Sequence, residues 1–331
     1  MLDFMRPRRR KGRTGRDRRF SSLPIRGTWR RAGLGLVVVA LAASAVLWGF
    51  GWFDASDSTS PRVAPGEFVP SPQTSHALVW AVGDGADGDE ESKALARLIA
   101  RSQPDLFLYL GDVYDKGTAS DFAQNYAPVY GHMARLTAPT PGNHDWPRHA
   151  EGYDPYWEQV TGKHPPSYYS FSLAGWQILS LNSEARHGRR SAQVRWLRSQ
   201  VRRPGTCRLA FWHRPRYSAG TEHGDQEDME PFWSALRGRA RIVVNGHEHD
   251  MQRHEVRDGI TEFVSGAGGK GLYEIDFSYA GLAFGNDTDW GALRLDLRPG
   301  RARFAFVTDA GLTLDSGTIA CRRELQRENV G

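Results

Sequence analysis

The chain has 331 residues, of which 40% are hydrophobic, so it is long enough for one large folded domain with additional segments. Its formal net charge of +5 is distributed unevenly, because residues 1–31 contain 12 Lys and Arg against two acidic residues and leave a charge of −5 for the remainder. The positive charge therefore lies outside the folded part, and we do not expect a nucleic-acid-binding domain.

The first expected element is a membrane-spanning helix over residues 32–53. These 22 residues contain no charged side chain, and a helix of that length reaches about 33 Å, enough to cross a bilayer core of about 30 Å. The basic tail before it, residues 1–31, predicts a cytoplasmic N-terminus and contacts with anionic lipid headgroups. We therefore expect a single-pass cell-membrane protein with its folded domain outside the cytoplasm. The alternative is a cleaved signal peptide that ends near Ala43-Ser44-Ala45 and releases the protein.

Residues 54–75 are rich in Ser, Thr, Pro and Gly and predict an extended linker. Apolar runs and helical spacing then alternate along the chain, which predicts one folded domain over residues 76–321 and a short tail over residues 322–331. The predicted strands are residues 78–82, 105–110, 168–171, 176–181, 209–211, 242–244 and 260–264, with late strands within 292–307. The predicted helices are residues 90–101, 122–133, 191–202 and 231–236.

Two cysteines, Cys207 and Cys321, lie in the part of the chain that we expect outside the cytoplasm. An even number of cysteines in an oxidising compartment predicts a disulfide bond. Two separate buried thiols are the alternative. A zinc–cysteine site is not expected, because the chain has no Cys-x-x-Cys motif.

Five short motifs contain Asp, Asn and His, whose oxygen and nitrogen atoms suit a pair of divalent or trivalent first-row metal ions. Four of them directly follow an apolar run that predicts a buried strand, and ligands at the carboxyl ends of such strands converge on one crevice. The motif with Asn143 instead follows a turn-rich segment. In chain order the motifs are Gly83-Asp84-Gly85, Gly111-Asp112, Gly142-Asn143-His144-Asp145, Trp212-His213 and Gly246-His247-Glu248-His249.

In this order the motifs resemble those of the calcineurin-like metallophosphoesterases, and among these the purple-acid-phosphatase-like branch with secreted bacterial members. The resemblance covers roughly residues 76–321 and extends to Leu181-Asn182-Ser183-Glu184, His213-Arg214-Pro215-Arg216-Tyr217 and Gly266-Ala267-Gly268-Gly269. It implies an α/β fold, a four-layer α/β/β/α sandwich.

The resemblance also implies two metal ions per chain, with iron, manganese and zinc as the candidate metals. A carboxylate shared between the ions would hold them together, and Asp112 occupies the position of that carboxylate. The first ion would be bound by Asp84, Asp112 and His249, and the second by Asp112, Asn143, His213 and His247.

The sequence departs from the family pattern at the first two motifs. Asp84-Gly85-Ala86 lacks the His that often follows the first Asp, and in purple acid phosphatases a Tyr three residues after the second Asp takes its place. Here the Tyr, Tyr114, comes only two residues after Asp112, with Val113 between them. Whether Tyr114 is a metal ligand or lies behind the ligands is left open.

The resemblance implies that His144, in the Asn143-His144-Asp145 triplet, lies beside the phosphate as the acid–base group, and an imidazole can protonate a leaving alkoxide near neutral pH. Asp145 is expected to orient that imidazole by hydrogen bonding, and a role as a cap or in a salt bridge is the alternative. Arg214 and His223 are candidate contacts for the substrate phosphate, although a surface charge and a solvated loop histidine are the alternatives. An aromatic cluster follows His144, and core packing is favoured over substrate stacking for its members Trp146, Tyr153, Tyr156 and Trp157.

The function implied by the resemblance is hydrolysis of phosphate esters, with monoesters favoured, by attack of a metal-bound hydroxide at a dinuclear centre. A phosphodiesterase of the same fold is the alternative enzyme. A membrane-anchored protein that binds a phosphate ligand without catalysis is the alternative from another functional class.

Overall fold

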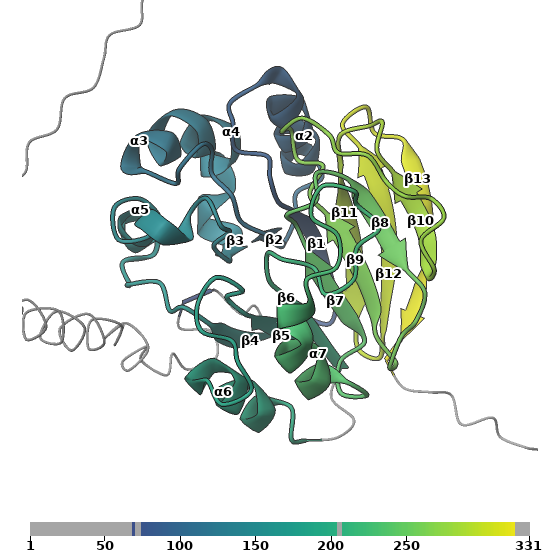
Figure 1. Ribbon diagram of the computed structural model, residues 1–331. Coiled ribbons are helices and arrows are strands. Elements are labelled where there is room, and N and C mark those ends of the chain that lie inside the picture. The colour runs from purple at the N-terminus through teal and green to yellow at the C-terminus, as the bar shows by residue number, and fades with distance from the viewer. Residues whose placement is uncertain (1–67, 70–73, 204–206, 322–331) are drawn as a thin grey trace, which may run out of the picture. The chain divides into compact units, whose positions relative to one another are not determined.

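The computed structural model describes residues 68–69, 74–203 and 207–321, which form two β-sheets with helices on their outer sides (Figure 1). The strands of the first sheet run in the order β13-β12-β11-β1-β2-β3, and those of the second in the order β10-β8-β9-β7-β6-β5-β4. The first sheet contains β1 (Ala77–Val82), β2 (Leu106–Tyr109), β3 (Thr137–Pro139), β11 (Gly291–Arg298), β12 (Arg301–Thr308) and β13 (Thr313–Ala320). The second contains β4 (Tyr169–Leu173), β5 (Trp176–Ser180), β6 (Cys207–Phe211), β7 (Ile242–Asn245), β8 (Met251–His254), β9 (Thr261–Ser265) and β10 (Leu282–Asn286).

Each sheet has a parallel centre, which explains why its central strands are apolar on both faces. In the first sheet β1 pairs in parallel with β2, and β2 with β3. In the second sheet β5, β6, β7 and β9 are parallel neighbours. Parallel strands end at the same edge of their sheet, so the segments that follow β1, β2, β6 and β7 are brought to one side of the molecule.

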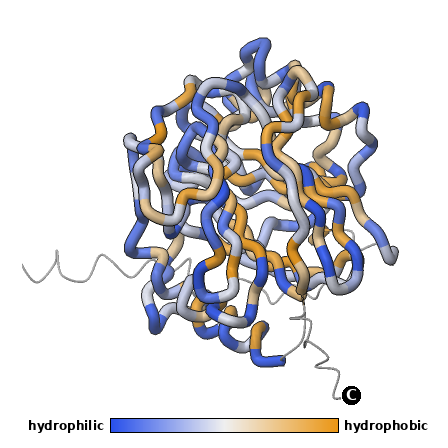
Figure 2. The backbone as a smooth tube through the Cα atoms, turned by 90° about the vertical axis from the view of Figure 1, so that its right-hand side faces the viewer, coloured by the Kyte–Doolittle hydropathy of each residue, from blue (hydrophilic) through white to orange (hydrophobic). Residues whose placement is uncertain are grey.

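The main hydrophobic core lies between the two sheets. Side chains such as Val79 and Leu295 from the first sheet share this core with Ile178, Leu209 and Phe263 from the second. In Figure 2 hydrophobic segments concentrate along the paired strands inside the molecule. The predicted α/β sandwich of two sheets is therefore confirmed.

Helices cover the outer sides of the sheets because each has one apolar stripe. Helix α6 and helix α7 place Val194, Leu197, Phe232 and Trp233 in a second core against Val243 of the second sheet. Helix α2 buries Leu95 and Ile99 and begins at Asp89, whose side chain accepts a hydrogen bond from the Ser92 amide at 2.9 Å. The α-helices are α2 (Glu90–Arg101), α3 (Ala119–Asp121), α4 (Ala127–Tyr130), α5 (Tyr153–Thr161), α6 (Ala192–Gln200) and α7 (Glu230–Leu236).

The single helix predicted over residues 122–133 is wrong in detail. The structure has a π-helix at Phe122–Tyr126, then α4, then a 3-10 helix at Gly131–Leu136. Pro128 has no amide hydrogen and cannot donate the backbone bond of a regular α-helix, which accounts for a change of helix type at this point. Two further 3-10 helices occur at Trp146–Arg148 and Glu227–Met229.

The compact unit includes residues that precede the domain predicted from residue 76. Phe68 and Val69 are buried, and the Phe68 ring lies 5.2 Å from the ring of Tyr169 on β4. The membrane-spanning helix expected at residues 32–53 and the basic tail before it lie outside the described residues. Within the part of the chain that the structure describes, no helix is long and apolar enough to cross a membrane.

The predicted disulfide is present and links Cys207 to Cys321, which are 114 residues apart in sequence. Cys207 begins β6 in the second sheet, and Cys321 directly follows β13 in the first. The bond therefore joins the edge of one sheet to the centre of the other.

Candidate metal centre

The candidate ligands come together at the carboxyl ends of the central strands. Asp84 follows β1, Asp112 follows β2 and His213 follows β6. Ligand atoms of these three buried side chains all lie within 4.8 Å of one another. His247 and His249 follow β7, and Asn143 follows the short strand β3. This strand was not predicted, because its last residue, Pro139, begins the turn-rich segment 139–142. Such a Pro is tolerated because β3 is an edge strand.

The backbone at three candidate ligands adopts a left-handed conformation. The φ angles are 60° at Asp84, 66° at Asp112 and 75° at His247. Residues with a side chain rarely adopt such angles, and where they occur they cluster at functional sites. The glycine before the Asn143 motif serves the same site, because a Cβ atom at Gly142 would overlap the Asp112 carboxylate.

His213 lies at the centre of one half of the site. Its Nδ1 is 2.9 Å from the carbonyl oxygen of Leu110, which fixes the ring so that Nε2 points into the cluster. Around this Nε2 lie three atoms that can each offer a lone pair, whereas Nε2 carries at most one hydrogen to donate. They are Asn143 Oδ1 at 3.1 Å, His247 Nδ1 at 3.1 Å and Asp112 Oδ2 at 3.4 Å.

The other half of the site is built around Asp84. The Tyr114 hydroxyl donates to Asp84 Oδ1 at 3.0 Å and lies 2.8 Å from His249 Nε2. Nδ1 of His249 is 2.8 Å from the carbonyl oxygen of Gly271, so its Nε2 also points into the cluster. The structure thus brings Tyr114 beside Asp84 and His249, two of the three proposed ligands of the first ion, although it occurs one residue earlier than the family pattern expects.

The electrostatics of the cluster call for positive charge. Burial raises the pKa of Asp84 to about 8, and the nearby Asp112 carboxylate adds to this effect. Burial alone would lower the pKa of His213, but the Asp112 carboxylate outweighs it and raises the value to about 10. A proton or a metal cation beside Asp112 would neutralise the negative charge of these buried carboxylates. With oxygen and imidazole donors only, the residues fit first-row metal ions.

The structure assigns His144 and Asp145 surroundings that differ from the expectation. His144 is one-third exposed, with Nε2 3.9 Å from Asp112 Oδ2 and Nδ1 against the carbonyl oxygen of Asp115. The Asp145 carboxylate does not orient this imidazole. It accepts three backbone hydrogen bonds instead, from the amides of Asp112, Val113 and Gly142 at 2.8, 2.9 and 2.8 Å.

The two candidate substrate contacts lie in different settings. The His223 ring stacks on His247 with centroids 4.0 Å apart, so it borders the site. Arg214 forms a salt bridge with Glu184, in which Nε is 2.9 Å from Oε1. The guanidinium is therefore already paired, and its contact with a substrate phosphate stays a prediction.

Two residues of the site were missed by sequence reasoning. Tyr273 stacks on His249 with centroids 3.9 Å apart, and no motif surrounds it in the sequence. Glu248 is buried and accepts hydrogen bonds from the amides of His223 and Gly224 at 2.8 and 2.6 Å. Its place between two histidines was visible in the sequence, but only the fold shows that it holds the His223 loop.

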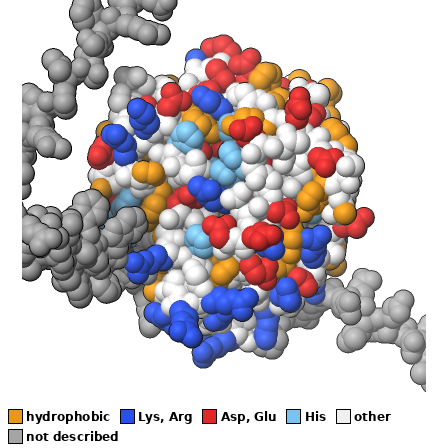
Figure 3. Space-filling view, in the orientation of Figure 1, with side chains coloured by type: hydrophobic (Ala, Val, Ile, Leu, Met, Phe, Trp, Pro, Cys, Tyr) orange, Lys and Arg blue, Asp and Glu red, His pale blue; other side chains and the backbone are white. Residues whose placement is uncertain are grey.

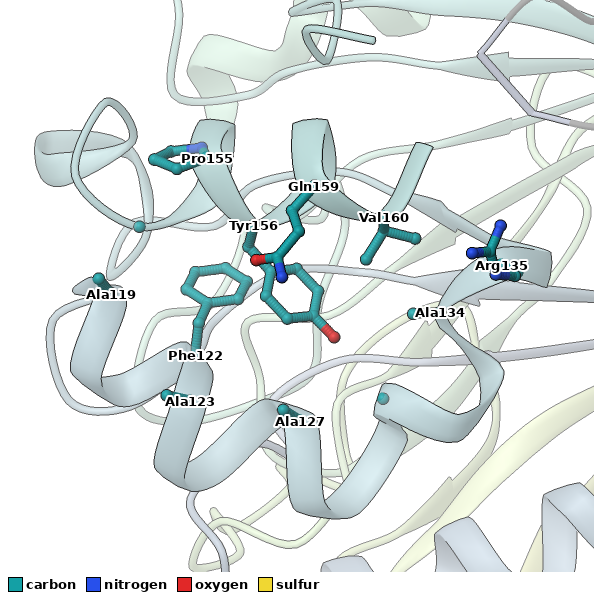
Figure 4. A pocket seen from close by; sticks show the side chains of 12 residues that line it. Ala119, Phe122, Ala123, Ala127, Ala134, Arg135, Pro155, Tyr156, Gln159 and Val160 are labelled. Atoms are coloured by element: carbon teal, nitrogen blue, oxygen red, sulfur yellow. The ribbon is translucent and has the colours of Figure 1, made fainter. Parts of the chain in front are cut away.

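The aromatic cluster mostly serves packing, as favoured. Tyr153 and Trp157 on α5 are buried in the core, whereas Trp146 stacks on His149 with centroids 4.2 Å apart. A cavity of about 660 Å³ lies between α5 and the segment of α3, the π-helix and α4 (Figure 4). None of the predicted site residues lines it, so this cavity is separate from the metal centre.

Comparisons with known proteins agree with this arrangement. Residues 77–251 match the family model of the calcineurin-like phosphoesterases. The chain is 25% identical over 211 residues to probable purple acid phosphatase 20 of Arabidopsis thaliana, covering 55% of this chain and 48% of that protein. The chain thus spans about half the length of the curated relative it matches.

Solved structures share the fold. Purple acid phosphatase PPD1 from yellow lupin (Lupinus luteus) seeds superposes with a TM-score of 0.61 at 17% identity, covering 76% of this chain and 55% of that one. GAP50, the anchor in the inner membrane complex of Plasmodium, gives a TM-score of 0.62 at 14% identity, and the match covers 76% of this chain and 90% of that one.

Proposed function

Because the chain belongs to the calcineurin-like phosphoesterase family, we propose that it hydrolyses phosphate monoesters at a dinuclear metal centre. The observation that carries this proposal is the convergence of Asn143 Oδ1, His247 Nδ1 and Asp112 Oδ2 on Nε2 of His213, which has at most one hydrogen to donate to them. The preference for monoesters rests on the similarity to a probable purple acid phosphatase.

Two groups of ligands would hold the ions, with Asp112 common to both. Asp84, Tyr114 and His249 form one group, which the short contacts of the Tyr114 hydroxyl bring together. The second group consists of Asn143, His213 and His247. When bound, the metals supply neutralisation of phosphate charge and activation of a water molecule. Iron, manganese and zinc suit this donor set.

His144 is the proposed general acid. With its Nδ1 hydrogen directed at the Asp115 carbonyl, the protonated ring carries its second proton on Nε2, on the side of Asp112. From there Nε2 can donate that proton to the oxygen of the leaving alcohol. Asp145 acts differently, because its three backbone hydrogen bonds hold the loops that carry Asp112 and Asn143.

His223 is the proposed contact for the substrate phosphate. Its ring covers His247, and its backbone is tied to the buried Glu248 side chain, so the loop holds the ring beside the site. Arg214 would have to leave Glu184 to contact phosphate, or act through its charge from where it lies.

We also propose that residues 32–53 anchor the chain in the cell membrane, with the phosphoesterase unit outside the cytoplasm. The disulfide between Cys207 and Cys321 supports this location, because such bonds persist in oxidising compartments.

The test uses the purified full-length chain. Metal content is measured by elemental mass spectrometry, alongside hydrolysis of a chromogenic phosphate monoester and of its bis-ester. The proposal expects about two metal ions per chain, faster turnover of the monoester, and loss of turnover with a chelator. Faster turnover of the bis-ester would point to a phosphodiesterase. No turnover of either ester after addition of manganese, iron or zinc would favour a binding protein.

A further inference from the structure

One stretch of the chain has an unusual charge. Residues 185–221 contain ten arginines and no Asp or Glu, although acidic residues occur throughout the rest of the folded part. Three of these arginines have other roles, because Arg208 is buried and Arg214 and Arg216 pair with Glu184 and Glu230. The other seven are exposed, and we call them the arginine surface: Arg186, Arg189, Arg190, Arg195, Arg198, Arg202 and Arg203.

The arginine surface is continuous around α6. The side chain of Arg195 donates to the carbonyl oxygen of Arg190, and Arg198 Nη1 donates to that of Arg189 at 3.2 Å. The loop before α6 is thereby folded onto the helix. The two together form a hollow of about 740 Å³, whose lining includes Arg186, Arg189, Arg190 and Arg195. In Figure 3 Lys and Arg side chains gather at the lower edge of the molecule, in the region of α6.

Positive charge at six of these seven arginines is not balanced by carboxylates of the described residues. Among the residues that the structure describes, no carboxylate lies within 4.0 Å of the guanidinium groups of Arg189, Arg190, Arg195 and Arg198, nor of Arg202 and Arg203. Repulsion between such closely spaced cations is relieved by an anionic partner. Guanidinium groups are also weakly hydrated and match phosphate geometry, so a surface of phosphate groups is a suitable partner.

The place where the N-terminal segment joins the domain identifies that partner. Phe68 packs on Tyr169 of β4. Helix α6 contacts the same strand, because Gln200 Oε1 lies 3.2 Å from Ser170 Oγ. The Trp196 ring of α6 also lies 5.0 Å from that of Tyr168, which directly precedes β4. Only 14 residues separate the proposed membrane helix from Phe68, a reach of at most about 50 Å. A membrane anchor would therefore hold the domain by the strand that α6 covers.

We infer that the arginine surface binds the anionic phospholipid headgroups of the membrane in which the chain is anchored. This inference rests on the proposed anchor and not on the proposed hydrolysis. It gives the domain one orientation, with α6 toward the bilayer. None of the candidate metal ligands or substrate contacts belongs to the arginine surface, so lipid binding there would not occupy the metal centre.

The test measures hydrogen exchange in the full-length chain, reconstituted in nanodiscs of phosphatidylcholine alone or mixed with phosphatidylglycerol. We expect amides of residues 186–203 to exchange several-fold more slowly in the anionic discs, and this protection to disappear at high salt, because salt screens exposed charges. The variant with Arg189→Gln, Arg190→Gln, Arg195→Gln and Arg198→Gln should lose the protection. The smaller variant Arg202→Gln with Arg203→Gln should weaken it and leaves the α6 loop contacts in place.

The matched control removes the same charge from exposed arginines elsewhere, Arg97→Gln, Arg135→Gln, Arg301→Gln and Arg303→Gln, and should keep the protection. Equal exchange in both kinds of disc would overturn the inference, as would equal loss in the control variant. Protection by single-stranded DNA but not by the anionic discs would also overturn it and point to a nucleic acid instead. Phosphatase activity is assayed on the same samples, so failure of the proposed hydrolysis is seen separately.

Discussion

Asp145 and His144 are adjacent in the chain, but their contacts give them separate tasks. The Asp145 carboxylate accepts three backbone hydrogen bonds in a buried position, whereas the His144 imidazole is partly exposed and faces Asp112. An Asp145→Asn change places an NH₂ group against a backbone donor, which should cost about 1–3 kcal/mol. We expect this variant to have a lower melting temperature and a lower metal content.

His144→Ala serves as its comparison. Removing this partly exposed side chain, the proposed general acid, should lower kcat by roughly 10²- to 10⁴-fold and leave melting temperature and metal content near those of the parent. Thermal unfolding, metal analysis and kcat on both variants test the division of tasks. An Asp145→Asn protein with unchanged stability and metal content would contradict the role we give to Asp145.

The candidate metal ligands could be predicted from the sequence, but several of the contacts around them could not. The candidate ligands were named because Asp, Asn and His at strand ends form a pattern along the chain. The partner of the His144 ring was not predictable, because the Asp115 carbonyl is a backbone group and carries no sequence signal. Tyr273 was missed for a related reason: its ring reaches His249 only through the folding of a loop 24 residues further along.

At the scale of elements, Glu262 on β9 fixes the loop that follows His213. Its buried carboxylate accepts hydrogen bonds from the amides of Arg216 and Tyr217 at 2.9 and 3.2 Å. Burial raises the pKa of Glu262 from 4.5 to about 8. Between these pH values the folded protein keeps a proton that the unfolded chain has released. The free energy of unfolding should therefore fall as pH rises from 4.5 to 8, by up to about 1.4 kcal/mol per pH unit.

Glu262→Gln has no such proton, so its stability should depend less steeply on pH across this window. Urea unfolding across the window, in parent and variant, measures both slopes. The matched control is Glu255→Gln at an exposed glutamate, which should keep the slope of the parent. Parallel slopes in the parent and in Glu262→Gln would rule out Glu262 as their source.

Elements with a strong apolar pattern were predicted well, and those without one were missed. Helix α2 spans the predicted residues Glu90–Arg101, because Leu95 and Ile99 form its buried stripe and Asp89 caps it. Strand β13 was missed because none of its residues is buried, and its sequence includes Gly317. Its pairing with β12 depends on tertiary contacts, which local propensity does not encode.

At the scale of the whole molecule, the metal ions should stabilise the fold. The candidate centre joins segments from both sheets, and without cations its buried carboxylates repel one another. A metal at a concentration one hundred times its Kd adds about 2.7 kcal/mol to the free energy of unfolding. A chelator should therefore lower the melting temperature by roughly 5–10 °C. In Asp112→Asn, which lacks the common carboxylate, the chelator should have little effect. A chelator that strips the metal from the parent without lowering its melting temperature would contradict this link.

The disulfide should stabilise the molecule chiefly by restricting the unfolded chain, because it closes a loop between residues 114 positions apart. For a loop of that size the expected contribution is about 4–5 kcal/mol. We expect Cys207→Ala with Cys321→Ala to unfold at lower urea concentration and with a steeper denaturant dependence, since the freed unfolded chain exposes more surface.

A reductant should bring the parent to the stability of the double variant and leave that variant unchanged. The candidate metal ligand His213 follows the end of β6 that is far from Cys207, so kcat below the unfolding transition should stay close to that of the parent. If reduction lowered kcat at temperatures where the fold persists, the bond would instead have to shape the metal centre itself.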